Sequence, residues 1–148
     1  MTEALIGLVG VIVGALLGGT GKYWLLRRDA WREARTSGLL TLADVRTAIA
    51  CTDPARLTAR LRLLLKTWET HREVLAAFRQ GNFPNGFRGP EWLELAGHMA
   101  LLQDVADTLD SINVTAARGE LEATERLLSR FEADPPVVGY VIRASFRR

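Results

Sequence analysis

Residues 57–78 read LTARLRLLLKTWETHREVLAAF, and apolar side chains recur in this stretch at alternating spacings of four and three residues. That spacing places the side chains along one face of an α-helix, which is the heptad pattern of helices that pack against other helices. The positions on this face, here called the bundle seam, are Leu57, Leu61, Leu64, Trp68, His71, Leu75 and Phe78. The pattern predicts an amphipathic helix at the centre of an all-α bundle.

Helical periodicity also precedes this segment, and no stretch of the chain alternates as a half-buried strand does. A helix is predicted from Arg27 to about Cys51, with Leu42, Val45 and Ile49 facing inward. The tripeptide Thr52-Asp53-Pro54 then has the capping carboxylate and the proline that are typical of a helix start. We therefore expect the seam helix to begin at Pro54.

The pattern after the seam predicts two further helices. Residues 80–89 are rich in glycine and asparagine and predict a loop, after which Pro90 opens a helix that continues to about Ile112. The wide apolar face expected for this helix consists of Trp92, Leu95, Met99, Leu102, Leu109 and Ile112. A fourth helix is predicted over residues 120–132. Residues 27–134 are therefore expected to form a cytoplasmic antiparallel bundle of about four helices, and residues 135–148 a basic C-terminal tail.

The start of the chain differs chemically from the rest. Residues 4–21 read ALIGLVGVIVGALLGGTG and contain no charged residue. At about 1.5 Å per residue, a helix of roughly this length crosses a hydrocarbon core of about 30 Å. A secretory signal peptide would begin with a positively charged region, but residues 1–3 are Met-Thr-Glu. We therefore predict a retained transmembrane anchor in residues 1–26.

The residues that flank this segment predict its orientation. Basic residues follow it, whereas Glu3 is the one charged side chain before it. By the positive-inside rule the N-terminus is outside and the C-terminal domain lies in the cytoplasm, at the plasma membrane. Amphipathic rings and long cations are favoured at headgroup depth. The expected membrane-interface residues are Lys22, Tyr23, Trp24, Arg27, Arg28 and Trp31.

Glycines recur along one face of the predicted anchor. This glycine stripe consists of Gly7, Gly10, Gly14, Gly18 and Gly21. Another backbone can approach such a face closely, and close packing across small residues drives helix association in lipid. The stripe predicts a homo-oligomer or docking against a partner membrane protein. The alternative is that glycine is simply common in membrane helices.

Charge is divided unevenly along the chain. Residues 22–88 carry 13 Lys or Arg against 6 Asp or Glu, and residues 91–134 carry 3 against 10, so the two halves are +7 and −7. Because an acidic half of equal size can pack against the basic half, the balance disfavours nucleic-acid binding. The single cysteine, Cys51, cannot form an internal disulfide, which suits a reducing cytoplasm.

Few residue types that carry chemistry are present. The chain has two histidines and one cysteine. His71 lies on the seam and His98 beside the apolar face of the third helix, so each is expected to be a buried histidine with a polar partner rather than a base or ligand. No pattern with metal-ligand spacing occurs. We therefore predict no catalytic residue, no metal, no cofactor and no small-molecule substrate.

Two one-turn carboxylate pairs, Glu91 with Glu94 and Asp104 with Asp107, resemble those of di-metal bundles. The Glu-x-x-His motifs that accompany such pairs are missing. We expect these residues to form a solvated acidic face toward the arginines of the seam helix.

Three segments carry a family resemblance: KYWLLRRDAWREAR at residues 22–35, TWETHREVLAAF at 67–78 and PEWLELAGHMALLQ at 90–103. Together with the glycine-rich apolar start, they resemble small single-pass membrane proteins of actinobacteria and their phages. The resemblance implies an anchor and a helical cytoplasmic domain, and it brings no catalytic residues.

These features favour a non-enzymatic protein that is anchored in the lipid bilayer and serves as an oligomerising scaffold or accessory subunit of a membrane complex. One alternative is a membrane-acting effector of the phage-exclusion, defence or holin-like kind, which assembles through the glycine stripe. Another is a small ligand-binding bundle in which Trp68 and His71 line the cavity.

Overall fold

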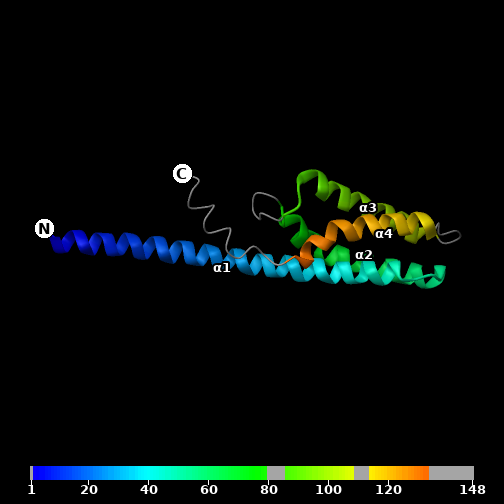
Figure 1. Cartoon of the computed structure of the whole chain (residues 1–148), viewed down its shortest axis with the longest axis horizontal. Coiled ribbons are helices and arrows are strands. Elements are labelled where there is room, and N and C mark those ends of the chain that lie inside the picture. Colours follow the sequence, from blue (N-terminus) through cyan, green and yellow to red (C-terminus); the bar gives the residue numbers. More distant parts are fainter. Residues whose placement is uncertain (1, 80–85, 109–113, 134–148) are drawn as a thin grey trace. The chain divides into compact units, whose positions relative to one another are not determined.

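The computed structural model describes the backbone of residues 2–79, 86–108 and 114–133, and in these ranges it contains no β-strand. One isolated backbone bridge joins Arg79 and Phe87. The chain divides into two units, Met1–Glu33 and Ala34–Arg148, which are described separately. The elements in chain order are α1 (Thr2–Ile49), α2 (Pro54–Ala77), α3 (Gly89–Asp107), α4 (Val114–Leu128) and the short 3-10 helix η1 (Ser129–Glu132) (Figure 1).

The second unit is a helical bundle. It contains residues 34–49 of α1 together with α2, α3 and α4, and successive helices run in opposite directions (Figure 1). Helix α3 lies against both α2 and α4. The predicted all-α bundle of about four helices is therefore confirmed.

Helix α2 begins where the sequence predicts. The Asp53 carboxylate accepts a hydrogen bond from the backbone N–H of Arg56 at 3.3 Å, and Pro54 occupies the first turn. Six of the seven seam residues are buried, and His71 is half-buried. The expectation that His71 is a buried histidine is therefore wrong. Partial exposure leaves its ring in contact with water, which avoids the cost of burying an imidazole nitrogen without a partner.

Helix α4 begins at Val114, which is earlier than the predicted start at residue 120. Its buried positions, Ala117, Leu121, Thr124 and Leu128, follow the same spacing of four and three. Two of these four side chains are small or polar, so hydrophobicity alone does not reveal the first turns of the helix. Leu109 and Ile112, which we predicted on the apolar face of the third helix, lie outside the described residues.

Three buried phenylalanines close one end of the bundle. The ring of Phe78 lies 5.2 Å from that of Phe131 and 6.3 Å from that of Phe87, between ring centroids, and Phe87 lies 5.7 Å from Phe131. The backbone N–H of Phe87 donates to the carbonyl of Phe78 at 2.9 Å, which holds the two rings together. At Gly38 of α1 a Cβ atom would overlap the Phe131 ring, so glycine is needed there for close packing.

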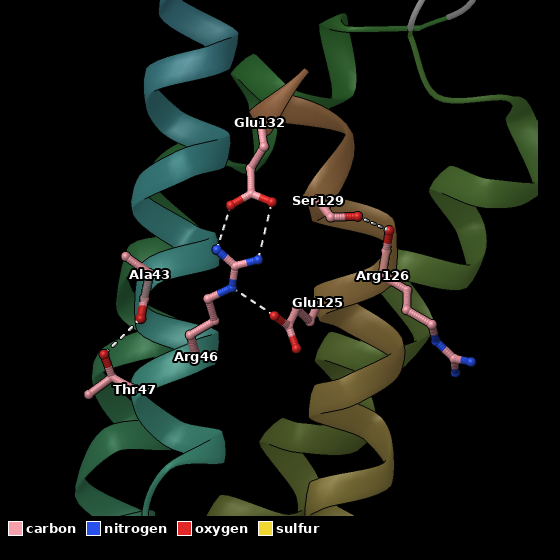
Figure 2. Close-up of polar contacts among 7 residues, drawn as sticks. All are labelled: Ala43, Arg46, Thr47, Glu125, Arg126, Ser129 and Glu132. Carbon is pink, nitrogen blue, oxygen red and sulfur yellow. Dashed lines mark hydrogen bonds and ion pairs between the residues drawn. The ribbon is translucent and has the colours of Figure 1, made fainter. Parts of the chain in front are cut away.

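A charged contact joins α1 to α4 and η1. The Arg46 guanidinium donates to Glu125 at 2.7 Å and to both carboxylate oxygens of Glu132 at 2.5 and 3.2 Å (Figure 2). Hydrogen bonds from Arg46 lower the pKa of Glu132, and the two carboxylates, Glu132 first, raise the pKa of Arg46. These side chains are about half exposed, so the contact orients the helices more than it stabilises them.

The first unit consists of α1 up to Glu33. The surroundings of residues 1–13 and 15–25 lie outside the described part of the chain, and these include Lys22, Tyr23, Trp24 and every glycine of the stripe except Gly14. Across the residues that can be described, no helix is long and apolar enough to cross a membrane. Gly14 is exposed, and beyond its own turns of α1 no atom of the described residues lies within 4 Å of the position that its Cβ would take.

The lowered pKa of Glu132 predicts a pH dependence of stability. A carboxyl group whose pKa is lower in the folded state than its ordinary value of 4.5 stabilises the fold above that value, and the contribution is lost as the pH falls through the lowered pKa. We expect the urea concentration at the unfolding midpoint of the wild type to decrease as the pH is lowered below about 4.5. In Arg46→Gln this decline should be shallower, because the group that lowers the pKa is removed.

The matched control is Arg126→Gln, which changes the same residue type on α4 where the side chain points away from Arg46 (Figure 2). It should retain the wild-type acid response. Parallel acid responses of the wild type and Arg46→Gln would contradict the role assigned to this contact.

Candidate functional site

A groove with a volume of about 400 Å³ lies between α2 and α3. Its lining, here called the α2–α3 groove, consists of Leu65, Trp68, Glu69, Arg72, Glu73 and Ala76 of α2 and Trp92, Ala96, Met99, Ala100 and Gln103 of α3. Each helix forms one wall of the groove, because α2 and α3 lie alongside each other over several turns.

Two tryptophans form an aromatic wall of the groove. The rings of Trp68 and Trp92 stack with 5.5 Å between centroids and 30° between ring planes. Trp92 also contacts Phe87 edge-on at 5.7 Å, and Phe87 belongs to the buried phenylalanine cluster. Trp68 is buried and Trp92 is half-buried, so one face of the pair is anchored in the core. Such a wall favours apolar or aromatic groups.

Small side chains leave room beside this wall. The groove stays open because three of its lining residues are small: Ala76, Ala96 and Ala100. Charged side chains lie at its rim. The rim carries Glu69, Arg72 and Glu73, and Arg72 pairs with Glu69 at 3.5 Å in solvent. The net charge of the three is one negative charge. The groove is therefore suited to an apolar group that bears a cationic or hydrogen-bonding end.

His98 lies outside the groove, between α3 and α4. Its Nδ1 forms a close hydrogen bond with Glu120 of α4, and its Nε2 lies 3.7 Å from a carboxylate oxygen of Glu94. The Nε2 atom is buried without a hydrogen-bond partner among the described residues. The expected polar partner of His98 is thus Glu120, which is 22 residues away in sequence. Sequence spacing gives no signal for such a pair.

Glu91 does not join the predicted acidic face toward the arginines of α2. Glu91 pairs instead with Arg130 of η1 at 3.1 Å. The backbone N–H of Arg88 and then the Arg130 guanidinium lower the pKa of Glu91. Arg130 also donates to the carbonyl of Gly86 at 3.2 Å and stacks 4.3 Å above the Phe87 ring. For Glu91 the prediction is wrong, because its cationic partner comes from η1 and not from α2.

The predicted candidates for ligand chemistry are not brought together. Trp68 lines the groove, but His71 does not. Cys51 donates its S–H to the carbonyl of Thr47 at 3.4 Å. Within the described ranges, no three His, Cys, Asp or Glu side chains converge as a metal site would require. The groove lining includes no histidine, cysteine, serine or threonine.

Comparisons of the chain with protein-family models, curated proteins and solved structures found no match. The function assigned to the groove therefore depends on the chemistry of its lining residues.

The composition of the groove predicts binding of an indole that carries a cation. Tryptamine is a suitable probe, because its ring can stack on the tryptophan wall and its ammonium can pair with Glu69 or Glu73. With 5-fluorotryptophan in the full chain, ¹⁹F NMR should show that tryptamine shifts the resonances of Trp68 and Trp92. Ala96→Leu fills the groove and should weaken this binding at least tenfold.

Ala59→Leu is the matched control, because it adds the same bulk at an exposed position of α2 that does not line the groove. It should bind tryptamine as the wild type does. Equal loss of binding in both variants, or shifts of all four tryptophans alike, would show that the probe does not occupy the groove.

Proposed function

We propose that this protein is a non-enzymatic, single-pass membrane protein whose helical domain acts as an oligomerising scaffold or accessory subunit of a membrane complex. The observation that carries the proposal is the uncharged segment of residues 4–21. Transferring a run of this length and composition from water into hydrocarbon is strongly favourable, whereas a domain of this size offers little interior to bury a helix that is apolar on every side.

The arrangement of charge supports a cytoplasmic domain. Helix α1 extends without a break from Thr2 to Ile49, so the uncharged segment and the first bundle helix belong to one element. Four arginines follow the uncharged segment within this element, at positions 27, 28, 32 and 35. Positive residues of this kind are retained on the cytoplasmic side of a membrane. The bundle is then held close to the cytoplasmic leaflet.

The α2–α3 groove supports a binding role for that domain. An aromatic wall, three alanines and a charged rim form a surface that can receive an apolar side chain of a partner. The partner chemistry that fits is a helix or loop of another membrane protein that presents an aromatic residue next to a basic one. Fixing such a partner next to the bilayer is the task of an accessory subunit.

The first test of this proposal is membrane integration and topology. We expect the full chain to remain in the membrane pellet after extraction with alkaline carbonate. Val9→Arg combined with Val13→Arg should release it, because each central arginine costs about 2.5–3.5 kcal/mol on insertion scales. Val9→Leu with Val13→Leu is the matched control and should stay in the pellet.

Cys51 reports the orientation in the same preparation, because it is the one cysteine of the chain and is partly exposed. In intact spheroplasts a membrane-permeant maleimide should label it, and an impermeant sulfonated reagent should not. Extraction of the wild type by carbonate would overturn the anchor, and labelling by the impermeant reagent would overturn the orientation.

A second test concerns association through the glycine stripe. A Cβ at position 14 meets no described atom beyond its own turns of α1, so we expect Gly14→Leu to preserve the helix and to block close approach of another helix. We expect the signal of a transmembrane association reporter to be at least fivefold lower for this variant than for the wild type. Ala15→Leu places the same leucine side chain about 100° around the helix and should retain the signal.

Equal signals from these two variants would contradict association through the stripe. Loss of membrane potential on expression of the wild type, but not of Gly14→Leu, would instead favour the membrane-acting effector.

A further inference from the structure

The rim of the α2–α3 groove carries a carboxylate that lacks a cation. Glu73 is exposed there and forms no ion pair or side-chain hydrogen bond with any other residue that the structure describes. The one arginine of the rim, Arg72, is paired with Glu69. The groove therefore keeps an uncompensated negative charge next to its tryptophan wall. A group that combines an aromatic ring with a cation complements such a surface.

The C-terminal tail of the same chain carries this combination of groups. Residues 135–148 read PPVVGYVIRASFRR and contain three arginines and no acidic residue. Phe146 has Arg143 three positions before it and Arg147 directly after it. Tyr140, the other aromatic residue of the tail, has arginines only at later positions. The ring and cation that the groove favours are therefore most closely combined around Phe146.

The tail begins at the end of the bundle where the groove begins. Phe131 of η1 lies 5.7 Å from Phe87, and Phe87 lies 5.7 Å from Trp92 of the groove, between ring centroids. The groove follows α3 for about three turns, or about 16 Å. At roughly 3.3 Å per residue, residues 134–146 can span about 43 Å. This length is enough to pass around a helix of about 10–12 Å diameter and still reach the groove.

We propose that the C-terminal tail is an internal ligand of the α2–α3 groove, in which Phe146 stacks on the tryptophan wall and Arg147 pairs with Glu73. The inference rests on the proposed function, because the tail occupies the surface that is assigned there to a partner. Tethering gives the tail a high effective concentration at the groove. A partner must displace it, and the apparent affinity of the partner falls in proportion to the fraction of molecules in which the groove is free. The contact is therefore autoinhibitory.

Disulfide formation within one chain tests the location of the tail. In a Cys51→Ser background, the full chain carries Ser145→Cys together with Ala96→Cys, a substitution in the groove lining. The matched control carries Ala77→Cys in place of Ala96→Cys, at an exposed position of α2 that does not line the groove. Two cysteines form a disulfide when their Cα atoms are about 4.4–6.8 Å apart. By mass spectrometry, we expect at least fivefold more intramolecular disulfide with position 96 than with position 77.

Tryptamine binding tests the consequence of this contact. Phe146→Ala removes the ring that occupies the groove, so its affinity for tryptamine in the ¹⁹F NMR assay should be at least threefold higher than that of the wild type. Tyr140→Ala removes the other aromatic ring of the same tail and is the matched control. It should bind tryptamine as the wild type does.

An exchange of charges tests the ion pair. In the chain that carries cysteines at positions 96 and 145, Glu73→Arg should lower the disulfide yield at least threefold, because it places two cations against each other. Adding Arg147→Glu should restore the yield. A merely structural effect of Glu73→Arg on α2 would not be reversed by a substitution in the tail.

Each measurement has a result that overturns the proposal. Equal disulfide yields at positions 96 and 77 would show that the tail does not select the groove, and a disulfide between two chains would place the tail in another copy. Equal tryptamine affinities of the wild type and Phe146→Ala would refute the internal ligand and leave the partner role of the groove in place. Release of the wild type by carbonate would refute the proposed anchor without altering a disulfide that forms within one chain.

Discussion

The packing of Phe78, Phe87 and Phe131 is the constraint on which the bundle depends. These rings come from the end of α2, the segment before α3 and η1, so one cluster connects three parts of the chain that are distant in sequence. Gly38 brings α1 against the same cluster. Arg130 covers Phe87 and binds Glu91 in the first turn of α3, so the polar contacts at this end depend on the aromatic ones. Because the rings are buried and in mutual contact, the helices can align in only one register here.

The seam of α2 was predictable, because its burial follows from a local pattern. A heptad repeat identifies the core-facing side of a helix from residues within a few turns, and Asp53-Pro54 marks its start through contacts that are equally local. The same reasoning predicted Leu95, Met99 and Leu102 on α3, and these residues are buried. Where burial depends only on which face of a helix a residue occupies, sequence periodicity is sufficient to predict which residues are buried.

The interactions that sequence analysis missed are those between elements. Phe87 lies in a segment that is read as a loop, and its burial depends on rings that are 9 and 44 residues away. The partners of Arg46 are 79 and 86 residues from it, so no spacing rule relates them. His98 with Glu120, and Glu91 with Arg130, are similar cases. The groove was missed for the same reason, although two tryptophans on neighbouring amphipathic helices were a usable signal for it.

Helix α3 shows how a periodicity argument can lose functional information. Its apolar residues are spread around the helix, which in sequence resembles one wide core-facing side. In the bundle, α2 and α4 cover only part of that circumference, and Leu93 and Leu101 remain outside. An exposed leucine face would reduce the solubility of a freely diffusing domain.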